Sequence, residues 1–177
     1  MNVLKLQSLM AEKRLSFHDL FELISIIHVD RIEHESIHAI EYPSSIMSIM
    51  NQANFTGRNM NIIVKNFPVI KERIGERLEV SFKLFDYPRG TTLEKAKRLI
   101  SKDGFIPSDM VFLIFLKILN PHIILNNMIV APEATWNPLG REKMVAFICG
   151  NGEKKEIDLM NYWKVSDEKV TFLGVKY

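Results

Sequence analysis

The chain has 177 residues, of which 47% are hydrophobic and 25% charged, and it carries a formal net charge of +2. This composition excludes collagen-like and disordered chains, and it leaves enough apolar side chains for one packed domain over residues 1–177. The charge is too small to indicate a partner, and the single cysteine, Cys149, excludes an internal disulfide, so we expect a soluble, cytoplasmic protein.

Helices are predicted for much of residues 1–120, each after a capping residue or a proline. In chain order, they cover residues 16–28, 44–50, 68–74, 91–102 and 109–119. The clearest start is the capping box of Thr91 and Glu94. The last helix is apolar nearly all round and belongs in the core. Its apolar run is shorter than the roughly 20 residues that cross a bilayer, so no membrane partner is expected.

Strands are predicted mainly after Pro121. In chain order, they cover residues 59–65, 77–86, 122–130, 144–149, 155–160 and 170–177, and the third of these is ambiguous. Asn151-Gly152 between two strands is a strong hairpin signal. The helix-rich segment over residues 1–120 and the strand-rich segment over residues 122–177 together predict an α+β fold. In it, N-terminal and central helices pack with a mainly antiparallel sheet that ends in a β-meander.

The pattern His-Glu-x-x-His at residues 34–38 is the most specific chemical signal in the sequence. On a helix, residues four apart share a face, so His34 and His38 could hold one zinc ion while Glu35 acts as general base on the bound water. The spacing is that of zincin-type metallopeptidases, and the likeness covers this short motif alone. At ~100° per residue, Glu41 falls on the same face and is the nearest candidate for the third ligand, with His122 and Glu133 as distant candidates.

The same segment also fits a strand. The alternate residues Ile32, His34, Ser36, His38 and Ile40 allow an irregular strand, in which the metal geometry changes entirely. Solvated or locally hydrogen-bonded histidines are the alternative to a zinc site.

Basic side chains gather in the middle of the chain. Residues 65–102 carry ten Lys or Arg and five Asp or Glu, a net charge of +5. A nucleic-acid surface over residues 71–102 would need these charges on one face, with aromatic side chains for stacking. On the expected helix 91–102, however, they are interspersed as on an ordinary solvated face.

Three aromatic residues late in the chain, Trp136, Tyr162 and Trp163, could belong to a partner surface, where aromatic side chains are common. Core or hairpin-capping roles are the alternative. We expect Cys149 to be a buried, inert thiol on a strand.

Our first functional hypothesis is a small non-catalytic binding or regulatory protein that acts through protein–protein contacts. An accessory, inhibitor- or immunity-like role belongs to this class, which needs no cofactor. The first alternative is a zinc-dependent hydrolase that uses His34, Glu35, His38 and Glu41. The second is nucleic-acid binding through residues 71–102.

Overall fold

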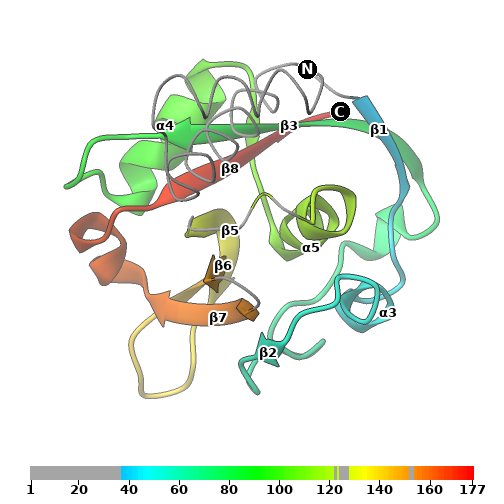
Figure 1. Ribbon diagram of the computed structural model, residues 1–177, viewed down its shortest axis with the longest axis horizontal. Helices are drawn as coiled ribbons and strands as arrows, with labels where there is room; N and C mark the ends of the chain where they lie inside the picture. Colours follow the sequence, from blue (N-terminus) through cyan, green and yellow to red (C-terminus); the bar gives the residue numbers. More distant parts are fainter. Residues whose placement is uncertain (1–36, 122, 124–127, 152–153) are drawn as a thin grey trace, which may run out of the picture. The chain divides into compact units, whose positions relative to one another are not determined.

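The computed structural model describes residues 37–121, 123, 128–151 and 154–177 (Figure 1). The chain divides into two units, residues 1–34 and 35–177, and every described element belongs to the second. The predicted single domain over residues 1–177 and the predicted helix at 16–28 involve residues outside this described region, so both stay predictions.

The described residues form strands, helices and two short 3-10 helices. The strands are β1 (Ile37–Glu41), β2 (Gly57–Arg58), β3 (Arg77–Asp86), β4 (Ile106–Pro107), β5 (Ile129–Trp136), β6 (Met144–Asn151), β7 (Lys154–Asn161) and β8 (Thr171–Lys176). The helices are α3 (Ile46–Met50), α4 (Leu93–Lys102) and α5 (Met110–Leu119), with the 3-10 helices η1 (Lys71–Arg73) and η2 (Tyr162–Asp167).

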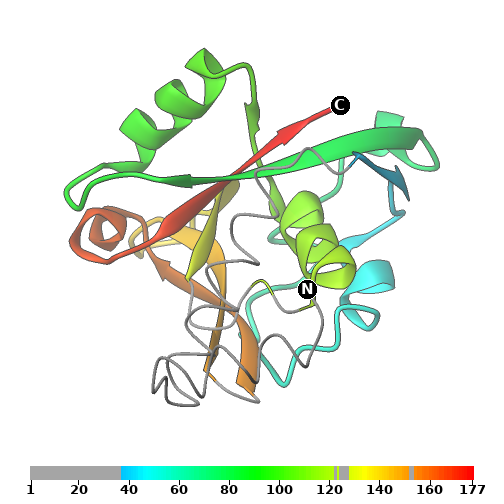
Figure 2. The same cartoon turned by 45° about the horizontal axis from the view of Figure 1, so that its top comes forward.

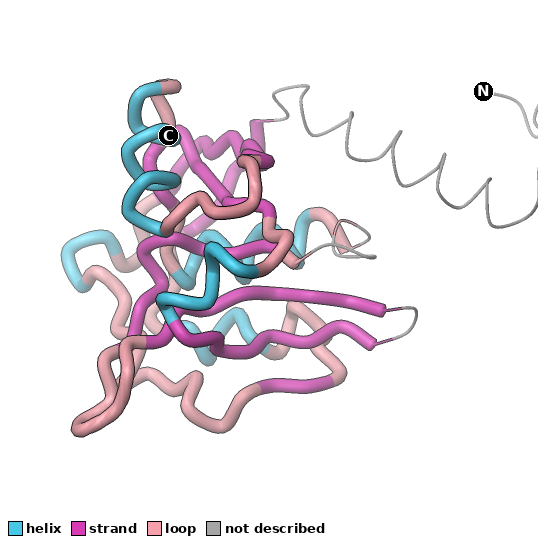
Figure 3. Tube along the Cα trace, turned by 90° about the vertical axis from the view of Figure 1, so that its left-hand side faces the viewer, coloured by secondary structure: helices cyan, strands magenta, loops and turns pink. Residues whose placement is uncertain are grey.

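One sheet unites all the strands. Its order is β1-β3-β8-β5-β6-β7-β2, and β4 pairs with β8 beside this row. The pairs are antiparallel except β5 with β8 and β2 with β7. β5, β6 and β7 form a meander, of which β6 and β7 are the long hairpin in Figure 3, while β8 returns to the middle of the sheet. The predicted α+β fold with a mainly antiparallel sheet is confirmed.

Helix α5 forms the inner core. The sheet curves around it, and α5 packs against β5, β6 and α3 (Figures 1 and 2). Residues 110–117 are all buried, as an all-round apolar helix requires. The Asp109 side chain caps the helix by accepting a hydrogen bond from the Phe112 amide at 3.1 Å. Within the described residues, no helix is long and apolar enough to cross a membrane.

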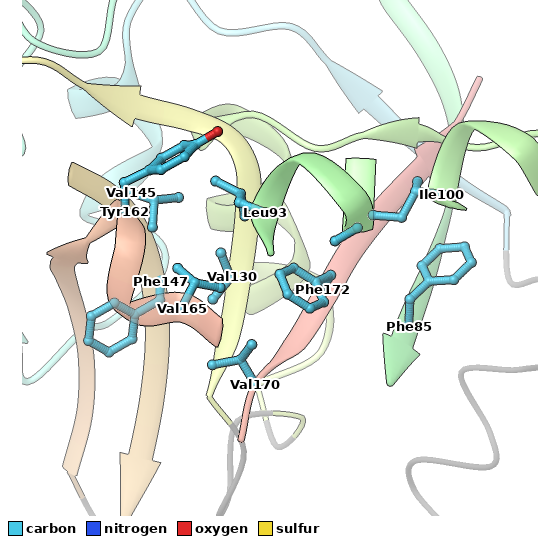
Figure 4. Packing of buried hydrophobic residues seen from close by; sticks show 11 residues of the cluster. Phe85, Leu93, Ile100, Val130, Val145, Phe147, Tyr162, Val165, Val170 and Phe172 are labelled. Atoms are coloured by element: carbon cyan, nitrogen blue, oxygen red, sulfur yellow. The ribbon is translucent and has the colours of Figure 1, made fainter. Parts of the chain in front are cut away.

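A second core lies under α4 and η2. Side chains of these two elements and of β3, β5, β6 and β8 gather there in one layer (Figure 4). The buried members are Phe85, Leu93, Ala96, Ile100, Val130, Val145, Phe147, Tyr162, Val165, Val170 and Phe172. Of the meander strands, β5 and β6 therefore pack on both cores, since α5 also contacts both of them.

Several predicted elements are confirmed. β3 spans residues 77–86 as expected from its alternating side chains, and β6 and β7 form the predicted hairpin. Ser45 caps α3, and its side chain accepts from the Ser48 amide. Helix α4 is followed by the C-cap Asp103, as expected. The predicted capping box of Thr91 and Glu94 is wrong, because the N-cap is Thr92, whose side chain accepts from the Lys95 amide, while the Thr91 hydroxyl donates to the Pro88 carbonyl at 2.7 Å.

The predicted strand at residues 59–65 is wrong, because turns occupy this segment. The Asn59 side chain accepts a hydrogen bond from the Asn61 amide at 2.9 Å, and the Asn66 side chain donates to the Asn61 carbonyl at 2.7 Å. Such side-chain bonds to the backbone favour turns over extended chain. Ile62 is nevertheless fully buried, so this residue of the apolar run packs into the core although it lies in a turn region.

Strand β5 lies later in the chain than the ambiguous prediction at 122–130. It extends to Trp136 through Pro132, a residue that weakens regular pairing because it lacks an amide hydrogen. The pairing of β5 with β6 shifts register between Val130 and Thr135, which accommodates the proline.

Candidate functional site

The residues of the predicted zinc motif are only partly within the described chain. His34 and Glu35 lie outside it, while His38 and Glu41 lie on β1. The helix expected to bring His38 and Glu41 to one face is therefore wrong for these two residues. β1 pairs with β3 over residues 37–41, and strand pairing imposes a period of two instead of 3.6.

His38 and Glu41 consequently project from opposite faces of β1. His38 is half-buried opposite Val80, and its ring lies 6.0 Å from the Phe82 ring. Glu41 is exposed at the end of the strand. Among the residues that the structure describes, no group of three or more His, Cys, Asp or Glu could hold a metal ion. The zinc site as a whole, which needs His34 and Glu35, stays a prediction.

The basic residues of 71–102 are distributed over η1, β3, α4 and the loop between β3 and α4. η1 and α4 lie at opposite ends of β3, a strand of ten residues and therefore about 30 Å long (Figure 2). Three of the cations are paired within the fold. Arg73 binds Glu76 at 2.8 Å, Lys97 binds Glu133 at 3.1 Å, and Lys83 lies 3.9 Å from Asp103. This arrangement does not favour one continuous basic face.

A hollow of about 260 Å³ lies between the β5–β6 loop, the start of β6, β7 and the turn that follows β2. We call it the Trp136 pocket. Its lining residues are Asn59, Asn61, Trp136, Pro138, Arg141, Glu142, Met144 and Leu159. The apolar members come from the sheet and from the proline, and the polar members come from the two loops. A concave apolar floor with a few polar groups is typical of a binding site.

A tight turn shapes the β5–β6 loop, the yellow loop at the lower left of Figure 1. The Arg141 amide donates to the Pro138 carbonyl at 3.1 Å, and Gly140 has φ +68°. Glycine with positive φ at the third position is the type II pattern, and the turn places Leu139 at its tip. Leu139 is fully exposed, at 102% of its reference area.

Asparagine bonds hold the opposite wall of the Trp136 pocket. The Asn59 side chain donates to the Asp158 carboxylate at 2.6 Å and accepts from Asn61, while the Asn59 amide donates to the Ile157 carbonyl at 3.0 Å. The turn after β2 is thereby fixed to β7. Met60, between two lining residues, remains 88% exposed.

The two charged residues of the pocket differ in their partners. The Glu142 carboxylate accepts a hydrogen bond from the Asn161 side chain, whose oxygen also accepts from the Trp163 amide at 2.9 Å. The Arg141 side chain is exposed and has no carboxylate or ring partner within the described residues. Arg141 is therefore available to an anionic group from outside.

A second hollow, of about 490 Å³, adjoins the first and shares Asn59 with it. It is lined by Gly57, Arg58, Asn59, Met60, Glu156, Ile157 and Asp158. Its walls are more strongly charged than those of the Trp136 pocket. Met60 lines this second hollow, while its chain neighbours Asn59 and Asn61 line the Trp136 pocket.

Cys149 is half-buried, and burial raises the pKa of its thiol, an effect that Glu156 and Asp158 reinforce. A raised pKa disfavours the thiolate, which is the nucleophilic form. The expectation of an inert thiol therefore fits this environment.

The three aromatic residues that were candidates for a partner surface differ in how far they are buried. Tyr162 is buried in the second core, whereas Trp163 is 70% exposed and Trp136 lines the pocket. The sequence analysis did not identify the pocket residues Asn59, Asn61 and Arg141.

The sequence signal that could have indicated the pocket is the run Trp-Asn-Pro-Leu-Gly at 136–140, which combines a turn with two large apolar side chains.

Comparison of the chain with protein-family models, with curated sequences and with solved structures finds no match.

Proposed function

We propose that this protein is a non-catalytic binding or regulatory protein that acts through protein–protein contacts made by the face around the Trp136 pocket. The observation that supports this is the exposure of large apolar side chains near the lining residues: Met60 at 88% and Leu139 at 102% are their neighbours in the chain, and Trp163, at 70%, is linked to Glu142 through Asn161. Single exposed apolar residues are common, but apolar side chains around a hollow are typical of an interface.

The positions of these residues link them to the pocket. Met60 lies between the lining residues Asn59 and Asn61, and Leu139 follows the lining residue Pro138. Trp163 is tied to Glu142 through the side chain of Asn161. Trp and Arg side chains are frequent at the hot spots of protein–protein interfaces, and this face has Trp136 and Arg141.

The rigidity of the face favours binding. The type II turn holds Leu139, and the asparagine bonds hold the segment of Met60, so little backbone conformational freedom would be lost on association. An accessory, inhibitor- or immunity-like role is the form that we propose. We keep the cytoplasm as its proposed location, on the basis of the lone Cys149.

Site-directed photo-crosslinking in cells of the native host tests this function. A benzophenone amino acid replaces Leu139 in the full chain, and we expect one discrete adduct with another protein after irradiation. Excess unlabelled wild-type chain should remove the adduct, and excess chain with Met60→Asp should not.

The matched control places the same amino acid at Lys95, an exposed residue of α4. No discrete adduct is expected there. The proposal is wrong if Leu139 gives no adduct, if Lys95 gives the same one, or if the Met60→Asp chain competes as well as wild type.

The zinc-dependent hydrolase and the nucleic-acid alternatives have no supporting observation among the described residues, so we do not propose them.

A further inference from the structure

The size of the Trp136 pocket limits what it can hold. Its volume of about 260 Å³ is below the roughly 300–1,000 Å³ of pockets that enclose drug-sized ligands. A cavity of about 150 Å³ is sufficient for benzene. The pocket therefore has room for one ring side chain, such as phenyl or indole, with a short length of attached chain.

The lining favours an aromatic occupant. Trp136 and Pro138 offer ring surfaces, and Met144 offers a thioether within the same hollow. Aromatic rings stack with one another and make favourable contacts with methionine sulfur. Leu159, from the opposite strand β7, completes the apolar floor.

The unpaired guanidinium of Arg141 favours a carboxylate next to that ring. Arg141 has no partner within the described region of the chain, whereas the Glu142 carboxylate is already bonded by Asn161. A guanidinium binds a carboxylate through two parallel hydrogen bonds. A cationic ligand group would instead meet the unpaired Arg141 at the rim.

We propose that the Trp136 pocket is the anchor subsite for a single aromatic side chain of a protein partner, and that an acidic group adjacent to this side chain binds Arg141. This inference rests on the proposed function, since it specifies which region of the partner enters the face described above. Tryptophan with a neighbouring carboxylate is the chemistry that best fits the volume and the lining.

The test uses the ¹⁵N-labelled full chain and two small probes. N-acetyl-L-tryptophan carries an indole and a carboxylate, and N-acetyl-L-tryptophanamide carries the same ring without the charge. The chain has two tryptophans, so the Trp136 indole signal is assigned with a Trp163→Phe variant. We expect both probes to shift this signal. The carboxylate probe should bind about threefold to fivefold more tightly, as for a partly exposed ion pair.

Arg141→Gln should reduce this preference to about one while the ring still binds. Arg98→Gln, at an exposed arginine of α4, is the matched control and should keep the preference. The inference is overturned if neither probe shifts the Trp136 signal, or if the wild-type chain binds both equally. It is also overturned if free tryptophan binds more tightly than either probe, which would indicate a small-molecule site.

The two proposals can fail separately. A crosslinked adduct at Leu139 without probe binding would leave the protein–protein function standing and exclude the aromatic anchor. Probe binding without any adduct would show a ring-binding pocket and exclude the proposed protein–protein function.

Discussion

The Tyr162 hydroxyl donates a hydrogen bond to the Glu94 carboxylate and so joins η2 to α4 across the second core. This bond lowers the pKa of Glu94, with a further contribution from Lys97, whose Nζ lies 3.7 Å from Glu94 Oε1. Burial, followed by the same bond, raises the pKa of Tyr162. The pair connects two elements that cover the same face of the sheet.

We expect Tyr162→Phe to lower the free energy of unfolding by about 1 kcal/mol at pH 7, which is less than the roughly 1.5–3 kcal/mol usual for a charged acceptor, because Glu94 is exposed. The folded-state pKa of Glu94 lies below its ordinary value of 4.5. The contribution is therefore present above pH 4.5 and is lost as the pH falls below it. Urea unfolding at pH 7 and pH 3 measures both effects.

Tyr87→Phe is the matched control for that change. The Tyr87 hydroxyl is buried without a hydrogen-bond partner in the described structure, so its removal breaks no bond. We expect the stability of this variant to be unchanged or slightly higher. Equal losses in both variants would contradict the role assigned to the Tyr162–Glu94 bond.

Asp109 caps α5 from a buried position, and burial raises its pKa. Asp109→Ala should lower the free energy of unfolding by about 1–2 kcal/mol, because the cap is lost. Asp109→Asn keeps a cap and removes the buried charge, so at pH 7 it should be at least as stable as wild type. Chemical unfolding of the three proteins distinguishes these outcomes.

The pH dependence gives a second check on Asp109. A carboxyl group with a raised folded pKa contributes stability that is fully present below its ordinary value of 3.8 and is lost as the pH rises through the folded pKa. The free energy of unfolding of Asp109→Asn should therefore increase relative to that of wild type as the pH rises. If Asp109→Asn loses as much stability at pH 7 as Asp109→Ala, the buried charge does not have the cost assigned to it.

Lys117 is buried to 2% exposure in the last turn of α5, and its ammonium group donates to the Pro121 carbonyl at 3.3 Å. Burial lowers its pKa, and Lys155 adds to this effect. The unfolded chain thus binds the proton more tightly, and the stability of wild type rises with pH towards the ordinary value of 10.5.

We therefore expect Lys117→Met to leave the stability at pH 7 unchanged or to raise it by about 1 kcal/mol. The difference from wild type should narrow between pH 7 and pH 10, as measured by urea unfolding. Lys102→Met, at an exposed lysine of α4, should show no such trend. A large loss in Lys117→Met at both pH values would show that the hydrogen bond to Pro121 outweighs the buried charge.

Gly174 lies where β8 passes under α4. A Cβ atom there would meet the Phe85 ring at 2.7 Å and the Ile100 methyl group at 2.9 Å. We expect Gly174→Ala to lower the free energy of unfolding by about 1–3 kcal/mol through overpacking. Because Phe85→Leu removes the closest atom, the two changes together should cost less than their sum. Additive losses would show that the contact with Phe85 is not the cause.

The sequence predicts best those elements whose signals are local. β3 has a regular alternation, α5 is apolar on nearly all sides, and the sequence Asn151-Gly152 stands between the paired strands β6 and β7. In each case neighbouring residues determine the pattern, and tertiary contacts reinforce it. The segment 59–65 also has a strand-like run of apolar residues, but hydrogen bonds from asparagine side chains to the backbone determine that it forms turns.

The Trp136 pocket could not be predicted in the same way. Its walls come from residues 59–61, the loop 136–144 and Leu159, which the sheet brings together over about 100 positions of sequence. For the zinc hypothesis, the sequence allows a helix that would place His38 and Glu41 on one face, and it equally allows a strand. Pairing with β3, a partner some 40 residues away, selects the strand.

The position of β8 has a consequence for the kinetics of folding. Within the described sheet, β8 connects the pair β1–β3 to the meander β5–β7, with Asp86 facing Thr171 across 85 positions of chain. During synthesis both halves therefore emerge before the strand that unites them. Contacts of such long range slow folding, and until β8 is in place the adjoining edges of β3 and β5 remain open to wrong partners.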